Sequence, residues 1–166
     1  MISLKIEHTK DFMNKLLLGE DFDSFLVKEA VIATFTTIQL EGSRNLEFYT
    51  PEEQETLGTD CAYVRWAEVK PLCLQMIKGK KTPLHFKFVF KLSEKNVEKL
   101  LRQTGLPFIT RDITGLFFHI RFDSGIITCI TGTALNIFTM DKSLDQEWDQ
   151  MVQRFLQKLQ LDYQEL

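Results

Sequence analysis

The feature of this sequence that most constrains its fold is a pattern of about 83 residues that occurs twice along the chain. An alternating apolar segment at residues 2–6 and an amphipathic segment at 13–17 recur at residues 86–90 and 97–101. Small changes in spacing between the two copies fall in expected turns, where insertions are tolerated. We therefore predict an internally duplicated fold.

The length and composition predict a single domain. The 166 residues are 44% hydrophobic and include 14 phenylalanines, which is enough apolar material for one substantial core. We expect one domain over residues 1–166, made of two pseudo-repeats at about 1–81 and 82–166. The net charge of −3 argues against a protein whose whole surface binds polyanions, but it allows a local basic surface.

The clearest secondary-structure signal is a strict alternation near the middle of the chain. The apolar residues Leu84, Phe86, Phe88, Phe90 and Leu92 alternate with His85, Lys87, Val89 and Lys91. This period of two predicts a strand with one face in the core and one largely basic face in solvent.

Other segments predict further strands and helices. Strands are expected at residues 2–6, 25–40 (one long or two consecutive), 118–122, 126–130 and 133–139. Helices are expected at residues 9–18, 64–78 and 93–103, after Thr50, and from Ser143 onward. Thr9, Ser93 and Ser143 are the expected N-caps, and the turn Asp123-Ser124-Gly125 predicts a hairpin.

These elements predict an α+β fold in which each copy runs strand, helix, two to four strands, helix. Two such units can pair edge to edge about a pseudo-twofold axis into one curved antiparallel sheet. The helices would then pack on one face of the sheet and leave the opposite face open.

The element order, including the strand-to-helix passage from Phe86 to Leu101, resembles two known architectures. One is the saddle of TATA-binding proteins, and the other is a domain of the DNA sliding clamps. The first resemblance implies contact through the open sheet face. The second implies contact through basic helix surfaces such as Lys95, Lys99 and Arg102.

Several segments also resemble a family of small bacterial proteins known only as uncharacterised. They are residues 77–84, Phe86-Lys87-Phe88-Val89, Thr131-Gly132-Thr133, and Asp141-Lys142-Ser143-Leu144 with Trp148. This resemblance implies no activity, ligand or catalytic residue.

Searches for catalytic and metal-binding motifs favour a protein without enzymatic activity, metal or cofactor. Gly79-Lys80 lacks the glycine and the hydroxyl residue that a phosphate-binding loop requires. His8, His85 and His119 show no metal-ligand spacing, and no serine lies in a nucleophile motif.

Cysteine usage and hydropathy predict a cytoplasmic protein. Cys61, Cys73 and Cys129 lie in apolar stretches without paired spacing, which is typical of buried reduced thiols. The first ten residues carry charges that a signal peptide would lack, and no apolar run is long enough to span a membrane.

One segment stands out by its charge. Residues 78–91 contain no acid and carry Lys78, Lys80, Lys81, His85, Lys87 and Lys91. If the alternation holds, Lys87 and Lys91 share the open face with Phe117, His119 and Arg121 of a neighbouring strand. These five residues, with Lys80 and Lys81, are the candidate binding residues, because cations neutralise phosphates and aromatic rings stack on bases.

The same residues are also explained by a solvated sheet face, which commonly carries Lys and Arg. The sequence therefore leaves three functions open. The first is a non-catalytic binding module with nucleic acid as a candidate ligand. The second is a protein-interaction or scaffold subunit, which includes a homo-oligomer. The third is a small-ligand binder or enzyme with a pocket lined by phenylalanine.

Overall fold

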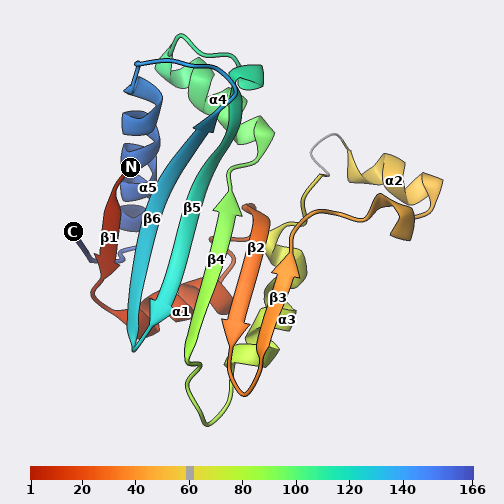
Figure 1. Cartoon of the computed structure of the whole chain (residues 1–166), viewed down its shortest axis with the longest axis vertical. Helices are drawn as coiled ribbons and strands as arrows, with labels where there is room; N and C mark the ends of the chain where they lie inside the picture. Colours follow the sequence, from red (N-terminus) through yellow and green to blue (C-terminus); the bar gives the residue numbers. More distant parts are fainter. Residues whose placement is uncertain (59–61) are drawn as a thin grey trace.

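The computed structural model describes residues 1–58 and 62–166, and its centre is one seven-stranded antiparallel sheet (Figure 1). The strand order across the sheet is β3-β2-β4-β5-β6-β1-β7. The strands are β1 (Ser3–Ile6), β2 (Leu26–Ala33), β3 (Thr37–Glu41), β4 (His85–Lys91), β5 (Ile113–Asp123), β6 (Ile126–Leu135) and β7 (Tyr163–Glu165).

Helices cover one face of this sheet. They are α1 (Thr9–Leu17), α2 (Pro51–Leu57), α3 (Trp66–Ile77), α4 (Glu94–Thr104) and α5 (Ser143–Lys158), with short 3-10 turns η1 (Leu46–Phe48) and η2 (Thr110–Asp112). In Figure 1, α1, α3, α4 and α5 lie behind the sheet, whereas α2 projects beyond the β3 edge and buries none of its residues. The predicted α+β class, with a curved antiparallel sheet and helices on one face, is confirmed.

The core lies between the sheet and these helices because the strands alternate as predicted. Phe86, Phe88 and Phe90 of β4 are buried, and Phe86 stacks on Phe122 of β5 with ring centroids 5.0 Å apart. Trp66 of α3 lies against Phe88 with ring centroids 4.9 Å apart. Leu84 is exposed and lies just before β4.

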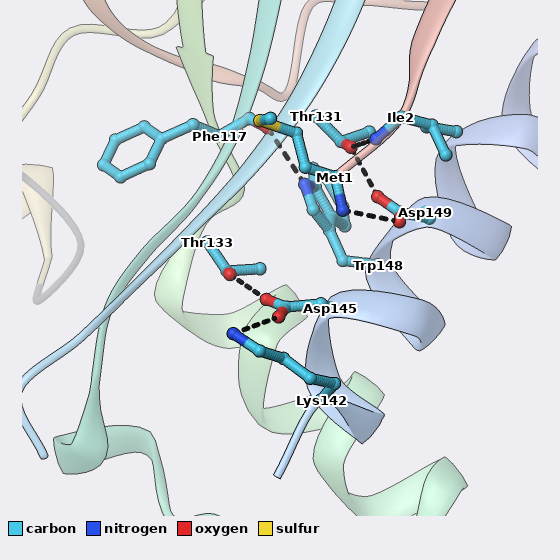
Figure 2. A network of polar contacts seen from close by, with 9 residues as sticks. All are labelled: Met1, Ile2, Phe117, Thr131, Thr133, Lys142, Asp145, Trp148 and Asp149. Carbon is cyan, nitrogen blue, oxygen red and sulfur yellow. Dashed lines mark hydrogen bonds and ion pairs between the residues drawn. The ribbon is translucent and has the colours of Figure 1, made fainter. Parts of the chain in front are cut away.

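Two hydroxyl–carboxylate contacts fasten α5 to the sheet (Figure 2). Thr131 of β6 donates to Asp149, and Thr133, two residues further on, donates to Asp145, one helical turn before Asp149. The Thr131 hydroxyl also accepts the backbone N–H of Ile2 at 2.9 Å, which ties in the segment before β1. Because Thr131 is buried, these bonds satisfy a polar group that would otherwise cost free energy.

Trp148 links the same helix to β5. Its indole is buried, and its Nε1–H donates to the backbone carbonyl of Phe117 at 2.9 Å (Figure 2). The indole therefore fixes the β5 backbone at Phe117, and the Phe117 side chain itself lies on the opposite face of the sheet.

Three local predictions are wrong. The strand expected at 133–139 is not a separate strand: residues 133–135 are the end of β6, which stops at Leu135. Thr9 is the first helical residue, not the N-cap, and its hydroxyl donates to the Gly125 carbonyl. Ser143 is likewise the first helical residue of α5, and its N–H is bound by the Asp141 carboxylate at 2.8 Å.

The predicted duplication is not confirmed, because strand pairing differs between the two halves. Both halves contain strand, helix, two strands and helix in that order, with η1 and α2 added in the first half and η2 and β7 in the second. In the second half β4 pairs with β5, whereas in the first half β1 pairs with β6 and β7 instead of β2. The two halves are therefore not related by the expected edge-to-edge twofold pairing, and the duplication stays a prediction.

Among the helices of the described residues, none has the length and apolar character needed to cross a membrane.

Candidate ligand-binding face of the sheet

The sheet face opposite the helices, here called the open face, carries most of the predicted binding residues. Register places Lys87 directly opposite Arg121 and Lys91 directly opposite Phe117, and His119 lies opposite Val89 between these pairs. Alternation explains this grouping, because the intervening residues of β4 and β5 point into the core. The structure thus brings together Lys87, Lys91, Phe117, His119 and Arg121.

The two remaining predicted residues do not join this group. Lys80 and Lys81 are exposed in the connection between α3 and β4. Neither lines a hollow on the open face. Their positive charge belongs to the loop that leads into β4 and not to the sheet surface.

A row of cations crosses the strands of the open face. Lys87 on β4 faces Arg121 on β5, Arg121 faces Thr128 on β6, and Thr128 faces Lys5 on β1. Three strand spacings of about 4.8 Å give this cation row a length of roughly 14 Å. Within the described residues, Arg121 and Lys5 form no ion pair, so their charges are available to a ligand.

Beside the cation row the open face is hollowed, with a volume of about 760 Å³. Val89 is apolar and buried, and the other side chains of the hollow are polar or charged. The lining consists of Lys28, Glu29, Gln39, Glu41, Ser43, Tyr63, Lys87, Val89 and His119. This volume is within the range of small-ligand sites, about 300–1,000 Å³.

A β-bulge and a close backbone approach shape this hollow. The β2–β4 register shifts between Val27 and Glu29, and Lys28 is the extra residue. Gly42 follows β3 and lies so close to β2 that a Cβ at this position would come 1.5 Å from the Val27 carbonyl oxygen. The Gly42 carbonyl then accepts the Val64 N–H at 2.9 Å, which places the neighbouring Tyr63 at the wall.

Arg44 holds this wall in position. Its guanidinium binds both carboxylate oxygens of Glu68, at 2.9 and 2.8 Å, and donates to the Tyr63 carbonyl at 3.3 Å. The bidentate contact with Glu68 raises the pKa of Arg44 above its usual range, and it lowers the pKa of Glu68. The pair ties the segment around Tyr63 to the start of α3.

The charges on the open face include two like-charged cross-strand pairs. Lys87 faces Arg121, and Glu29 faces Glu41. Like charges directly opposite each other destabilise a sheet, so this arrangement is unfavourable for folding alone. One lateral ion pair, between Lys87 Nζ and Glu29 at 3.0 Å, joins the two pairs.

His119 is the titratable group at the centre of this charge pattern. Burial lowers its pKa, and the nearby charges of Lys87, Arg121 and Lys28 lower it further. The imidazole is therefore neutral at pH 7, where it can donate one hydrogen bond and accept another.

Aromatic rings flank the cations. The Lys28 ammonium lies 4.9 Å from the centroid of the Phe117 ring, and the Lys91 ammonium lies 4.9 Å from the centroid of the Tyr63 ring. Such cation–π contacts hold the ammonium groups near the sheet without neutralising them.

Sequence reasoning missed several residues of this face, among them Lys5, Lys28, Glu29, Glu41 and Tyr63. Lys5 joins the row because β1 pairs with β6, and strand order is not visible in sequence. Lys28 depends on a bulge, and Tyr63 on the close approach at Gly42. Gly42 was the available signal, because a glycine directly after a strand often marks a close backbone approach.

One exposed cluster outside the open face also carries potential metal ligands. Ligand atoms of Glu7, His8 and Asp162 lie within 4.8 Å of one another, and all three residues are exposed. His8 lies 3.9 Å from the Asp162 carboxylate, which describes a surface ion pair when His8 is protonated. The cluster gives no further indication of a bound ion.

Comparisons with known proteins place the chain in a family without adding a function. Neither the curated proteins nor the solved structures contain a match to it. One protein family, described as a family of unknown function (DUF5721), matches residues 15–164. Because this match covers β2 to β6, α2 to α5 and the end of α1, which is nearly the whole fold, the chain belongs to the DUF5721 family.

Proposed function

We propose that this protein is a non-catalytic binding module that binds single-stranded nucleic acid on the open face of its sheet. The observation that supports this most is the cation row of Lys87, Arg121 and Lys5, which crosses three strand spacings without an acid in the row. Lys and Arg side chains neutralise phosphates, and a row perpendicular to the strands suits an extended backbone.

Aromatic side chains next to the row support the same proposal. Phe117 is half-buried on the open face, two residues before His119 on β5. Tyr63 lies at the wall of the hollow. Sheet-based single-strand binders stack bases on such rings while cations hold the phosphates. The like-charged pair of Lys87 and Arg121 fits this role, because a phosphate between them would relieve their repulsion.

We further propose that the protein works in a reducing compartment such as the cytoplasm. Cys73 and Cys129 are both buried and unpaired. Burial raises the pKa of Cys73 to about 11 and also raises that of Cys129, so both thiols stay protonated and unreactive. Cys61, the third predicted thiol, lies outside the described residues.

The Arg121→Glu variant tests the proposed binding. The reversal removes one of three phosphate contacts, so we expect at least roughly tenfold weaker binding of a labelled oligonucleotide at low salt. The slope of log K against log salt should also become shallower by about 0.7. Fluorescence anisotropy with single-stranded DNA and RNA at several salt concentrations measures both quantities.

The same change replaces a like-charged cross-strand pair with an attractive one, so the free energy of unfolding should rise by about 0.2–1 kcal/mol.

Arg102→Glu is the matched control, since Arg102 is exposed on α4, away from the open face. It makes the same change in net charge and should leave affinity almost unchanged. Wild-type protein that fails to bind any single strand at low salt contradicts the proposal. So does an equal loss of affinity in both variants, because non-specific attraction would then explain the binding.

A protein-interaction surface at the β3 edge is the second candidate function. Four exposed apolar residues gather there: Phe35, Ile38, Leu72 and Leu84. Ile38 and Leu72 line one apolar groove between β3 and α3. Phe35 and Leu84 lie next to the β2–β3 turn, since the Leu84 N–H bonds the Ala33 carbonyl. An edge strand such as β3, with exposed apolar residues beside it, is a site for pairing with a strand of another chain.

This candidate predicts a mass that rises with protein concentration, measured by light scattering or sedimentation. Ile38→Lys places a charge on the edge and should reduce the measured mass to that of the monomer. Ile126→Lys changes an isoleucine of similar exposure, 45% against 40%, on an interior strand and should not. A monomer at all concentrations contradicts self-association through this edge.

A further inference from the structure

The hollow beside the cation row contains acidic side chains, which the row itself lacks. Two carboxylates, Glu29 and Glu41, face each other across β2 and β3 on the side of the hollow away from Arg121. A phosphate would be repelled at this position. The acids therefore suit a part of the ligand that donates hydrogen bonds.

The hydrogen bonds within the hollow leave an acceptor without a partner. The two oxygens of Glu29 bind Gln39 Nε2 at 3.0 Å and Lys87 Nζ at 3.0 Å. One oxygen of Glu41 accepts the Ser43 hydroxyl at 2.8 Å. Within the described residues, the other Glu41 oxygen has no hydrogen-bond partner. An exposed carboxylate that faces a second carboxylate gains from a donor bound between them.

Cationic donors line the part of the same hollow nearer to β4 and β5, since Lys87 belongs to β4 and the Lys28 ammonium lies over Phe117 of β5. Lys28 and Lys87 carry ammonium groups, and the His119 imidazole is neutral. The hollow thus offers the Glu41 carboxylate as an acceptor at β3 and ammonium donors toward β4 and β5, with the Glu29–Lys87 ion pair between them. A ligand that fits both sides must present a pair of donors and a pair of acceptors on different edges.

We propose that this hollow binds the base of a guanine nucleotide within the single strand. Guanine presents two adjacent donors, N1–H and N2–H₂, which match the Glu41 carboxylate, where one oxygen is open and the other accepts one hydrogen bond from Ser43 and has room for a second. Its two acceptors, O6 and N7, match lysine. The inference rests on the proposed function, because Lys87 belongs to both the cation row and the hollow and would bind next to the backbone.

The other bases fit this hollow less well. Adenine and cytosine each carry a single amino donor next to a ring-nitrogen acceptor, which a carboxylate would repel. Thymine and uracil place one N–H between two carbonyls. Only guanine offers two neighbouring donors, so the carboxylate pair favours guanine over each of the other bases.

The experiment measures the affinity of wild-type protein for labelled oligothymidine and for the same strand with one central guanine, inosine or adenine. One guanine should tighten binding by about ten- to a hundredfold, the range of a good bidentate base contact. Inosine lacks the 2-amino group and should give an intermediate affinity. Adenine should bind like thymine.

Two variants tie the preference to the hollow. Glu41→Gln should abolish the preference for guanine, while Glu98→Gln, an exposed glutamate on α4, should keep it. The Glu41 change also removes repulsion from Glu29, so the midpoint of thermal unfolding of this variant should not fall. An unchanged midpoint would exclude unfolding as the cause of the lost preference for guanine. Equal affinity for all four strands, with steep salt dependence, would overturn the guanine inference and leave nucleic-acid binding standing. No binding of any strand would overturn both.

Discussion

Replacing Trp148 with alanine is expected to lower the free energy of unfolding by about 3–5 kcal/mol, a large part of the stability of a domain of this size. The indole is 1% exposed, and it fills the space between α5 and the sheet. Its removal would leave a cavity and would also break the hydrogen bond from the indole N–H to the Phe117 carbonyl. Urea unfolding followed by circular dichroism measures the loss.

Trp148→Phe separates the two contributions. It keeps most of the apolar volume and removes the N–H donor, so we expect a smaller cost of about 1–3 kcal/mol. Trp66 is then the single remaining tryptophan and reports unfolding by fluorescence. A loss below about 1 kcal/mol for the alanine variant would mean that α5 is held mainly by the threonine–aspartate contacts with β6.

Gly42→Ala is expected to have the second large effect, because the new methyl carbon would collide with backbone and not with a movable side chain. The Cβ would stand 1.5 Å from the Val27 carbonyl oxygen and 2.4 Å from its carbonyl carbon. Relief requires β3 to separate from β2, so we expect a cost at the upper end of about 1–3 kcal/mol or beyond. Thermal unfolding measures it, and the hollow should lose Tyr63 from its wall.

Gly132→Ala is the control for this change. Gly132 also lies in the sheet, but its nearest neighbour to a new Cβ is His119 Nε2 at 3.8 Å, which is ordinary contact. Its stability should stay close to that of wild type or rise slightly, because alanine restricts the unfolded chain. Similar losses in the two variants would argue that glycine at position 42 serves flexibility instead of close approach.

The elements that sequence reasoning located best are those whose signal is local. The alternation of β4, the serine cap and Gly105 stop of α4, and the two-residue turn at Ser124-Gly125 each depend on a few neighbouring residues. The turn residues have φ of 51° and 82°, as a tight hairpin requires. By contrast, β7 has three residues and exists only because β1 offers an edge, so no local pattern announces it.

The residues of the candidate site likewise fall into those that a local pattern predicts and those that depend on long-range strand pairing. Lys87, His119 and Arg121 were predicted to share a face because parity along a strand decides which side a residue points to. That rule needs no knowledge of which strands are neighbours. Lys5 and Glu41 required the strand order, which depends on long-range pairing energies that a single sequence does not reveal.

The position of β1 in the sheet has a consequence for how the protein is made. This strand, at residues 3–6, pairs on one side with residues 128–130 and on the other with residues 163–165. During synthesis it therefore emerges long before either partner, and it must wait unpaired while more than a hundred further residues leave the ribosome. A sheet closed by contacts so distant in sequence should fold slowly, because the entropy cost of closing a long loop comes before the strand pairing that stabilises it. Nascent chains of this protein are thus expected to expose an unpaired β1 until residues 128–130 of β6 have left the ribosome.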